Sequence, residues 1–108
     1  MAGGLGDMSS LLKQAQGMQK RMQEVERDLE QRILEGSSGG GVVKAFVNGQ
    51  QEIQAVKIGA DAVDPDDVET LEDLVTGAVR QAMSAAKELR ERELGKVTGG
   101  MNLPGMGF

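Results

Sequence analysis

The glycine-rich run GSSGGG, residues 36–41, separates two segments of opposite character. Before it lies a long pattern with helical spacing, and after it a short pattern with the alternation of a β-hairpin. Because glycine adopts backbone conformations that other residues avoid, we expect a hinge between the two segments. This division predicts a long helix followed by a small sheet.

The segment before the glycines carries apolar residues at alternating intervals of three and four. Such spacing places a narrow apolar stripe on one face of a helix, and the stripe needs a partner. Ser9 and Ser10 are candidate N-cap residues, because their hydroxyls can accept hydrogen bonds from the free N–H groups of the first turn. The stripe consists of Met8, Leu11, Ala15, Met18, Met22, Val25 and Leu29.

The segment after the glycines predicts a hairpin. Asn48-Gly49 supplies residues that tolerate positive φ in a tight turn, and apolar residues alternate on both sides of it. With a two-residue turn, Phe46 and Ile53 fall on one face of the hairpin, so that face also needs a cover. A third strand is expected at about residues 32–37, with the glycines as a loose connection. The opposite face carries Val43, Ala45, Val47, Val56 and Ile58.

A second helix follows the hairpin. Asp64-Pro65-Asp66-Asp67 predicts its start, with Asp64 as N-cap, Pro65 in the first helical position and acids at the positive end of the helix dipole. Gly95 or Gly99-Gly100 is expected to end it. Its apolar stripe consists of Val68, Leu71, Val75, Ala78, Ala82, Ala85 and Leu89, widened by Leu74, Val79 and Ala86.

These elements predict one α+β domain over residues 1–108, with a long N-terminal helix, a three-stranded antiparallel sheet, a long C-terminal helix, and flexible ends at about 1–8 and 99–108. Only two of the 108 residues are aromatic, so the core is small and the striped helices expose more apolar surface than it can cover. We therefore expect a homodimer, with domain swapping or a higher assembly as alternatives. The residues expected in the dimer interface or the core are Leu11, Met18, Met22, Val25, Phe46 and Ile53.

The residue inventory argues against several classes of function. The chain has no cysteine and no histidine, so disulfides, thiolate chemistry, common zinc sites and histidine catalysis have no basis in it. No apolar run is long enough to span a bilayer, and no signal-peptide pattern opens the chain, so we expect a soluble intracellular protein. We expect no enzyme activity, no cofactor, no metal and no small-molecule substrate.

Two motifs could suggest a site. The glycine run lacks the Gly-Lys-Ser/Thr ending of a phosphate-binding P-loop, so we interpret it as a connection. Acidic residues crowd one short stretch and could suggest a metal site, but helix capping and a solvated acidic face explain them more simply. The acids are Asp61, Asp64, Asp66, Asp67, Glu69, Glu72 and Asp73.

Charge is unevenly distributed along the chain. The net charge is −5, but residues 1–23 carry 3 − 1 = +2 and residues 80–108 carry 5 − 3 = +2. If the two helices pack antiparallel, the start of the first meets the end of the second, and that end of the molecule is basic. The other end, with the acidic stretch, would repel phosphate. The alternative is ordinary solvation of two helices, with basic residues near a C-terminus.

Several segments resemble the YbaB/EbfC family of bacterial nucleoid-associated proteins. They are LLKQAQGMQKRMQ from Leu11, EGSSGGGVVKAFVNG from Glu35, LEDLV from Leu71 and TGGMNLPGM from Thr98, and together they cover almost the entire chain in order. The resemblance implies a cytoplasmic, nucleoid-associated homodimer whose helical arms project like tweezers, bind duplex DNA and alter its organisation, with an effect on gene expression as a further expectation. Gly17 inside the first helix and the acidic net charge depart from the expected pattern.

Matching those arms to this sequence assigns the DNA contacts to basic residues of both helices, through phosphate neutralisation and DNA shape. The alternative function is a helical-arm adaptor for protein partners, which would use the methionines of the first stripe. Salt separates the two, because phosphate contacts weaken with salt and an apolar contact does not. The predicted DNA contacts are Lys13, Lys20, Arg21, Lys87, Arg90, Arg92 and Lys96.

Overall fold

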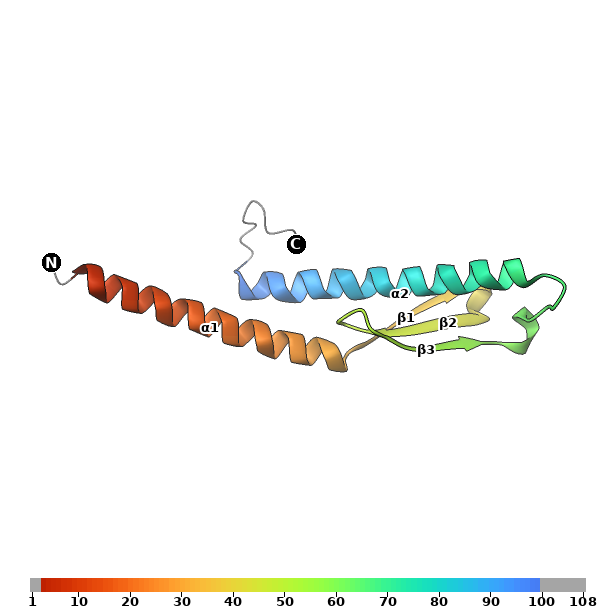
Figure 1. Cartoon of the computed structure of the whole chain (residues 1–108), viewed down its shortest axis with the longest axis horizontal. Helices are drawn as coiled ribbons and strands as arrows, with labels where there is room; N and C mark the ends of the chain where they lie inside the picture. The colour runs from red at the N-terminus through yellow and green to blue at the C-terminus, as the bar shows by residue number, and fades with distance from the viewer. Residues whose placement is uncertain (1–2, 100–108) are drawn as a thin grey trace.

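A computed structural model describes residues 3–99 of the chain. Two long helices flank a small antiparallel sheet with strand order β1-β2-β3 (Figure 1), which confirms the expected α+β class. The elements are α1 (Gly3–Gln31), β1 (Ile33–Ser38), η1 (Gly39–Gly41), β2 (Val43–Asn48), β3 (Ile53–Ile58), η2 (Ala60–Ala62) and α2 (Val68–Val97).

The core lies between α2 and two of the three strands. Val43, Ala45 and Val47 of β2 are fully buried, and they pack in one cluster with alanines of α2. Because α2 packs on β1 and β2, strand β3 is left at the uncovered edge of the sheet. The buried residues of α2 are Ala78, Ala82, Ala86, Leu89 and Leu94.

Small residues allow the backbone of α2 to approach the sheet closely. Gly36 of β1 lies under the helix, and a Cβ at this position would collide with the carbonyl oxygen of Ala78 and with Ala82. A side chain larger than hydrogen would therefore push the helix away from the sheet. The expected hinge is thus wrong for the first half of the glycine-rich run, because residues 36–38 belong to β1.

The second half of the glycine-rich run makes the β1–β2 connection. Gly39, Gly40 and Gly41 have φ of 59°, 70° and 94°, a region that favours glycine. The expected strand at about residues 32–37 is confirmed as β1, which pairs with β2 from Ile33 opposite Asn48 to Ser38 opposite Val43.

The hairpin has the expected strands but a different turn. Residues 49–52 form a four-residue loop, so the predicted two-residue turn is wrong. The side chain of Asn48 organises this loop, since its Oδ1 accepts hydrogen bonds from the backbone N–H groups of Gln50 and Glu52, both at 3.0 Å. Val43 still lies opposite Ile58, but a bulge makes Ile53 the register partner of Val47, so Ile53 does not follow the simple alternation expected of it.

Helix α1 begins earlier than expected. It starts at Gly3, so Ser9 and Ser10 lie inside it and the predicted N-cap there is wrong. Residues 3–8, expected to be part of a flexible end, belong to this helix, whereas residues 1, 2 and 100–108 lie outside the described range.

Helix α2 begins later than expected. Its N-cap is Asp67, whose carboxylate accepts hydrogen bonds from the backbone N–H of Thr70 at 3.3 Å and from its hydroxyl at 2.7 Å. Asp64 instead closes a turn before the helix, because its oxygens accept hydrogen bonds from Asp66 and Asp67. The predicted start three residues earlier is therefore wrong, while the predicted end at Gly99, with φ of 68°, is confirmed.

Candidate nucleic-acid interface

The two helices lie antiparallel, but their ends are offset (Figure 1). The first half of α2 lies over the sheet, so only its second half reaches α1. The last turn of α2 meets α1 at about Arg21 and Val25, where the two helices line a groove of about 460 Å³. The prediction that the end of α2 meets the start of α1 is therefore wrong, because the sheet takes up part of the length of α2.

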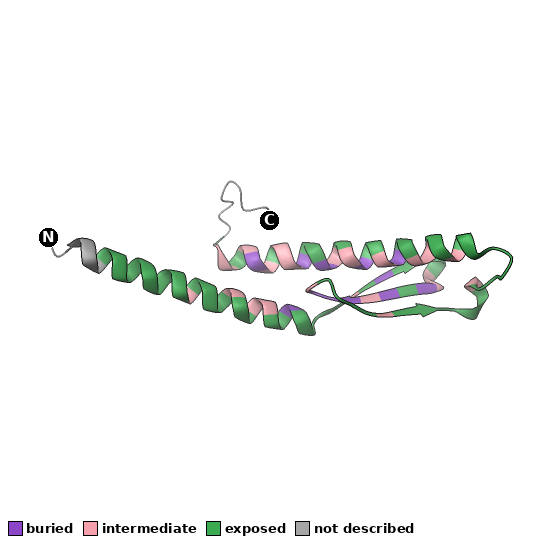
Figure 2. Cartoon of the chain, viewed as in Figure 1, coloured by how far each residue is buried: buried purple, intermediate pink, exposed green. Residues whose placement is uncertain are grey.

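The N-terminal part of α1 projects beyond the end of α2. We name residues 7–20 the overhang, and every residue in it is exposed except Gly17, which is half-buried (Figure 2). Toward the sheet the same stripe becomes covered: Met22 and Val25 are half-buried and Leu29 is fully buried. The expected core residues of α1 therefore fall into two groups. Met22 and Val25 are half-buried, whereas Leu11 and Met18 are 61% and 36% exposed.

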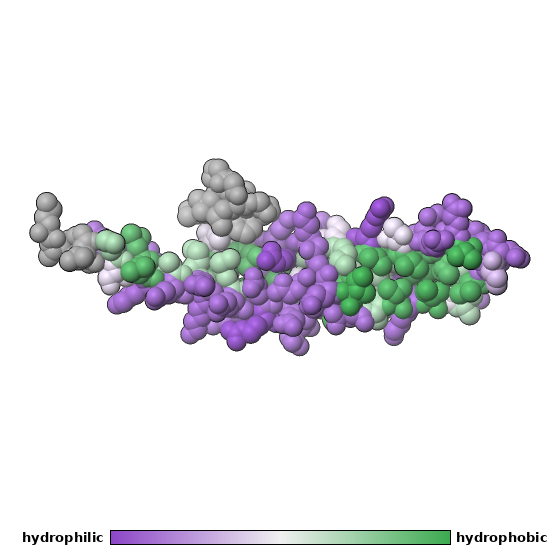
Figure 3. All heavy atoms as spheres, viewed as in Figure 1, coloured by the Kyte–Doolittle hydropathy of each residue, from purple (hydrophilic) through white to green (hydrophobic). Residues whose placement is uncertain are grey.

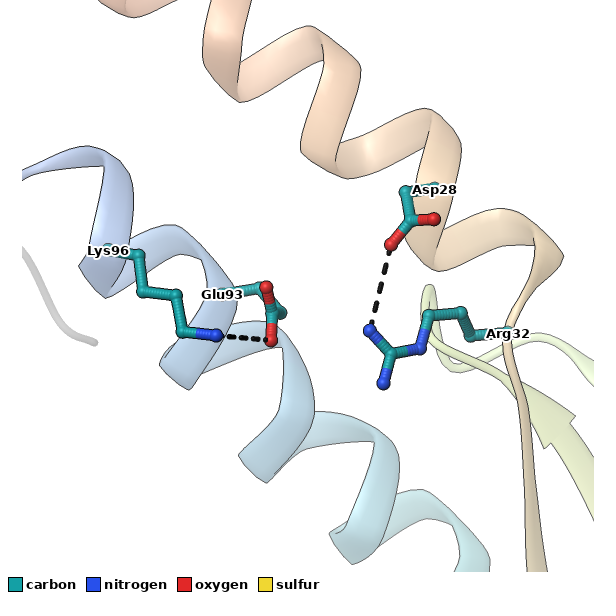
Figure 4. A network of polar contacts seen from close by, with 4 residues as sticks. All are labelled: Asp28, Arg32, Glu93 and Lys96. Carbon is teal, nitrogen blue, oxygen red and sulfur yellow. Dashed lines mark hydrogen bonds and ion pairs between the residues drawn. The ribbon is translucent and has the colours of Figure 1, made fainter.

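The groove between the helices is not basic, because the charges of its acidic and basic side chains nearly cancel. Lys96 pairs with Glu93 at 3.1 Å on α2, and Asp28 of α1 pairs at 3.7 Å with Arg32, which directly follows that helix (Figure 4). Two basic and three acidic side chains line the groove, which gives 2 − 3 = −1. A phosphate therefore gains little by entering it. The lining residues are Arg21, Glu24, Val25, Asp28, Glu93, Lys96 and Val97.

The predicted contacts do not converge on one surface. Arg90 is turned toward α1, where its guanidinium lies 3.6 Å from the Glu26 carboxylate, and Lys96 is held by Glu93. The five others form no ion pair within 4 Å among the described residues. They are all exposed, and they are Lys13, Lys20, Arg21, Lys87 and Arg92.

A row of basic residues on the outer face of α1 was only partly recognised from the sequence. Lys13 and Lys20 are two helical turns apart, and Arg27 continues the row after two more turns. All three are exposed. The seven-residue spacing was the signal that could have added Arg27, and it also links Arg80 to Lys87 on the exposed side of α2.

The acidic stretch lies at the far end of the molecule from the overhang. It covers η2, the following loop and the first turns of α2, at the end where the sheet meets α2 (Figure 1). No group of three or more metal-ligating side chains was found among residues 3–99, and the capping contacts of Asp64 and Asp67 account for part of the acidity.

Comparison with known proteins agrees with this architecture. The sequence model of the YbaB/EbfC DNA-binding family matches residues 4–101. A nucleoid-associated protein of Clostridium perfringens is 52% identical over 104 residues, which cover 96% of this chain and 93% of that protein. The nucleoid-associated protein TTE0040 of Caldanaerobacter subterraneus subsp. tengcongensis is 47% identical over 100 residues, covering 93% and 90%.

A solved structure shares the fold. The crystal structure of the uncharacterized protein HP0035 from Helicobacter pylori superposes with a TM-score of 0.72 at 25% identity, and the match covers 85% of this chain and 94% of that one. Fold and relatives together define the class as small α+β nucleoid-associated proteins. The chain belongs to the YbaB/EbfC DNA-binding family, which is not a family of enzymes.

Proposed function

We propose that this chain binds duplex DNA as a homodimer, mainly through phosphate contacts on the outer faces of its helices, and thereby alters DNA organisation in the nucleoid. The family is a DNA-binding one and the relatives are named nucleoid-associated proteins. The observation that carries the proposal is the row of Lys13, Lys20 and Arg27 along the exposed face of a projecting helix.

The row has dimensions that suit a duplex. Two helical turns separate neighbouring members by roughly 10 Å, so the row extends over roughly 20 Å. Duplex DNA carries about one charge per 1.7 Å of its axis, so each basic side chain has phosphates within reach. Arg80 and Lys87 present a similar pair on α2.

The net charge of −5 does not oppose this contact. The molecule is 79 Å long along its longest axis, and the acidic stretch lies at the end opposite the overhang. At physiological salt the Debye length is about 8 Å, so the acids are screened from a phosphate at the overhang. They instead disfavour contact between DNA and the end of the molecule where the sheet meets the start of α2.

A homodimer is supported by the shape of the chain and by its exposed apolar surface. The radius of gyration is 20.7 Å, whereas a compact domain of this length has about 13 Å. Figure 3 shows a continuous apolar surface over the sheet and the neighbouring part of α2. The exposed side chains of β3 and its surroundings include Ile53, Val56, Ile58, Val63 and Val68, at 39% to 54% exposure.

A second copy suits this surface because one edge of the core is uncovered. Val56 and Ile58 lie opposite Ala45 and Val43 in the sheet, so they share the face that α2 covers only over β1 and β2. A symmetric partner with the same patch would cover β3 and leave both sets of helices free. We define Val56, Ile58, Val63 and Val68 as the β3 patch.

The decisive experiment is a salt titration of duplex binding with charge-reversed variants. If Lys13 and Lys20 of two protomers neutralise about four phosphates, log K falls with log salt at a slope of roughly −3.6. We expect Lys13→Glu with Lys20→Glu to remove most of this slope and the binding. Lys44→Glu with Lys57→Glu is the matched control, because it changes the charge equally on the sheet.

Equal loss in both double variants would contradict contacts on the helices and would favour the sheet or a general effect of charge. Binding of a protein partner that persists at high salt, without binding of DNA, would instead support the helical-arm adaptor.

A further inference from the structure

The overhang of α1 has an apolar stripe that no residue of the described range 3–99 covers. Met8 and Leu11 are 62% and 61% exposed and Met18 is 36% exposed. Figure 3 shows a second, smaller apolar area near the N-terminal end of α1, separate from the one over the sheet. An exposed apolar row on a projecting helix indicates a surface on which another element packs.

The spacing of the stripe is that of a coiled coil. Met8 and Ala15 occupy the first position of a seven-residue repeat, and Leu11 and Met18 occupy its fourth position. Such a seam is covered by a second helix with the same repeat. The cover that α2 gives to the stripe ends at about Arg21. The overhang of a second copy has the required pattern and is bare over the same length.

The sizes of the side chains favour an antiparallel pair. In that arrangement a residue in the first position packs against a residue in the fourth position of the other helix. Met8 then faces Met18 of the second copy, and Leu11 faces Ala15, so a large side chain fills the space left by a small one. A parallel pair would instead place Ala15 opposite Ala15 and leave a gap.

The residues beside the stripe favour the same arrangement. Asp7 and Arg21 both occupy the seventh position of the repeat, and both are exposed. In the antiparallel register Asp7 lies beside Arg21 of the second copy, and the symmetry repeats this contact of opposite charges at the other end. On the other flank, Leu12, which is 61% exposed, lies beside Leu12 of the second copy. A parallel pair would set Asp7 beside Leu12.

We propose that the overhang binds, in antiparallel orientation, the overhang of a copy that belongs to another homodimer. Lys13, Lys20 and Arg27 occupy the position of the repeat that lies opposite the stripe. The pair therefore carries a basic row on each of its two outer faces and bridges two duplexes. The contact itself is independent of DNA, whereas the bridging rests on the proposed function.

Symmetry places the second copy in another homodimer. The β3 patch and the overhang lie toward opposite ends of the molecule, and α1 runs close to the longest axis (Figure 1). A two-fold axis through both surfaces would run along α1 and would make the paired helices parallel. An antiparallel pair requires an axis across the helix. The two contacts therefore use different axes, and together they connect homodimers.

The contact is short, so it is weak in the free protein. Isolated helices shorter than about 12–15 residues are marginal in water, and Gly17 lowers the helix propensity of the overhang by about 1 kcal/mol relative to alanine. At tens of micromolar the free protein therefore stays at the mass of the homodimer. Copies gathered on DNA have a higher effective concentration, which favours the contact there.

Disulfide trapping of the full-length protein at hundreds of micromolar, without DNA, tests the contact. The chain has no cysteine, so single-cysteine variants Met8→Cys and Met18→Cys can be mixed in equal amounts and oxidised. We expect the mixed disulfide between the two positions to form about tenfold faster than either same-position disulfide. Peptide mapping after cleavage at Lys13, which lies between the two positions, distinguishes the products.

The matched control replaces Met18→Cys with Gln16→Cys. Position 16 lies at nearly the same height in the antiparallel register but about 140° around the helix from the stripe. Its mixed disulfide with Met8→Cys should form about tenfold more slowly than that of Met18→Cys.

Capture of a second duplex tests the bridging. A duplex is held on beads, the protein is added, and the amount of a second, labelled duplex retained is measured. Leu11→Gln with Met18→Gln removes two apolar contacts without changing charge, and Ser9→Gln with Gln16→Asn is the control on the other side of the helix. We expect both variants to bind one duplex as the parent does, and the stripe variant to retain about tenfold less of the second duplex.

The other outcomes overturn the proposal. Faster formation of the two same-position disulfides would show a parallel pair, and equal rates from positions 16 and 18 would show that the stripe is not the contact. A stripe variant that retains as much second duplex as the parent would refute the bridging. A parent that binds no duplex would refute the proposed function and the bridging with it, while the trapping without DNA still decides the contact.

Discussion

The guanidinium of Arg90 in α2 lies 3.6 Å from the carboxylate of Glu26 in α1. Among the described residues 3–99, this contact is the ion pair that joins the two helices. Both side chains are about two-fifths exposed, so the pair contributes little to stability, on the order of 0.2–1 kcal/mol. The pair has a larger effect on whether Arg90 is available to DNA, because Arg90 must leave Glu26 before it can contact a phosphate.

We predict that Glu26→Gln strengthens duplex binding more than Glu30→Gln does. Both substitutions remove one negative charge from neighbouring turns of α1, but only the first releases Arg90. The extra gain should be up to about fivefold, which corresponds to the roughly 1 kcal/mol that such a pair is worth. Fluorescence anisotropy with a labelled duplex at low salt measures it, and equal gains would show that Arg90 makes no phosphate contact.

Gly36→Ala should destabilise the fold by about 1–3 kcal/mol, because the added methyl group overlaps the backbone of α2 at Ala78. Gly77→Ala is the control: its Cβ would meet Ser38 at an ordinary 3.8 Å, and it should stabilise the helix by up to about 1 kcal/mol. Urea unfolding followed by circular dichroism gives both values. A neutral Gly36→Ala would mean that α2 can move away from the sheet at no cost.

Replacing Val56 and Ile58 together by Glu should dissociate the proposed homodimer, since the β3 patch would then bury charges that lack partners. Light scattering at tens of micromolar should report twice the chain mass for the parent and the single mass for the variant. Thr76→Glu, on the exposed side of α2, is the control. A parent that stays monomeric and cooperatively folded would refute the dimer, and a variant that stays dimeric would move the interface elsewhere.

Loss of the cap at α2 should be measurable. We expect Asp67→Ala to cost about 1 kcal/mol, because the backbone N–H of Thr70 loses its acceptor. Asp66→Ala removes the same charge without removing the cap and should cost less. Thermal unfolding of the two variants distinguishes them, and equal midpoints would show that charge rather than capping stabilises this end of the helix.

Much of the fold followed from periodicity, because spacing of three and four or of two is a local property of the chain. Both helices, the three strands and the antiparallel order were predicted in this way. The ends of the elements were not, since they depend on which of several competing groups satisfies the backbone. Asp67 displaced Asp64 as the cap, and the side chain of Asn48 replaced the two-residue turn with a longer loop.

The candidate site was predictable only in part. Residue type and charge balance pointed to both helices, but the sequence does not show how far the sheet offsets one helix from the other. That offset places Arg90 of α2 beside Glu26 of α1, and it places Arg21 of α1 in the groove that faces α2. Two of the expected DNA contacts therefore face the other helix. The resemblance to relatives carried the function itself, because a chain with a net charge of −5 gives a weak electrostatic signal for DNA.

The overhang of α1 has the geometry of a lever whose pivot lies where the contact with α2 ends. Behind that pivot the helix is held firmly, because the backbone N–H of Gly49 donates to the carbonyl oxygens of Leu29 and Arg32 at 2.8 and 3.0 Å and Arg90 of α2 pairs with Glu26. The overhang, residues 7–20, is about 20 Å long, and a rotation of about 10° would carry its tip roughly 3.5 Å. That displacement is about one base-pair step of a duplex at 3.4 Å. In the proposed homodimer, two such arms could follow a bent or widened duplex while the buried cluster under α2 keeps its packing.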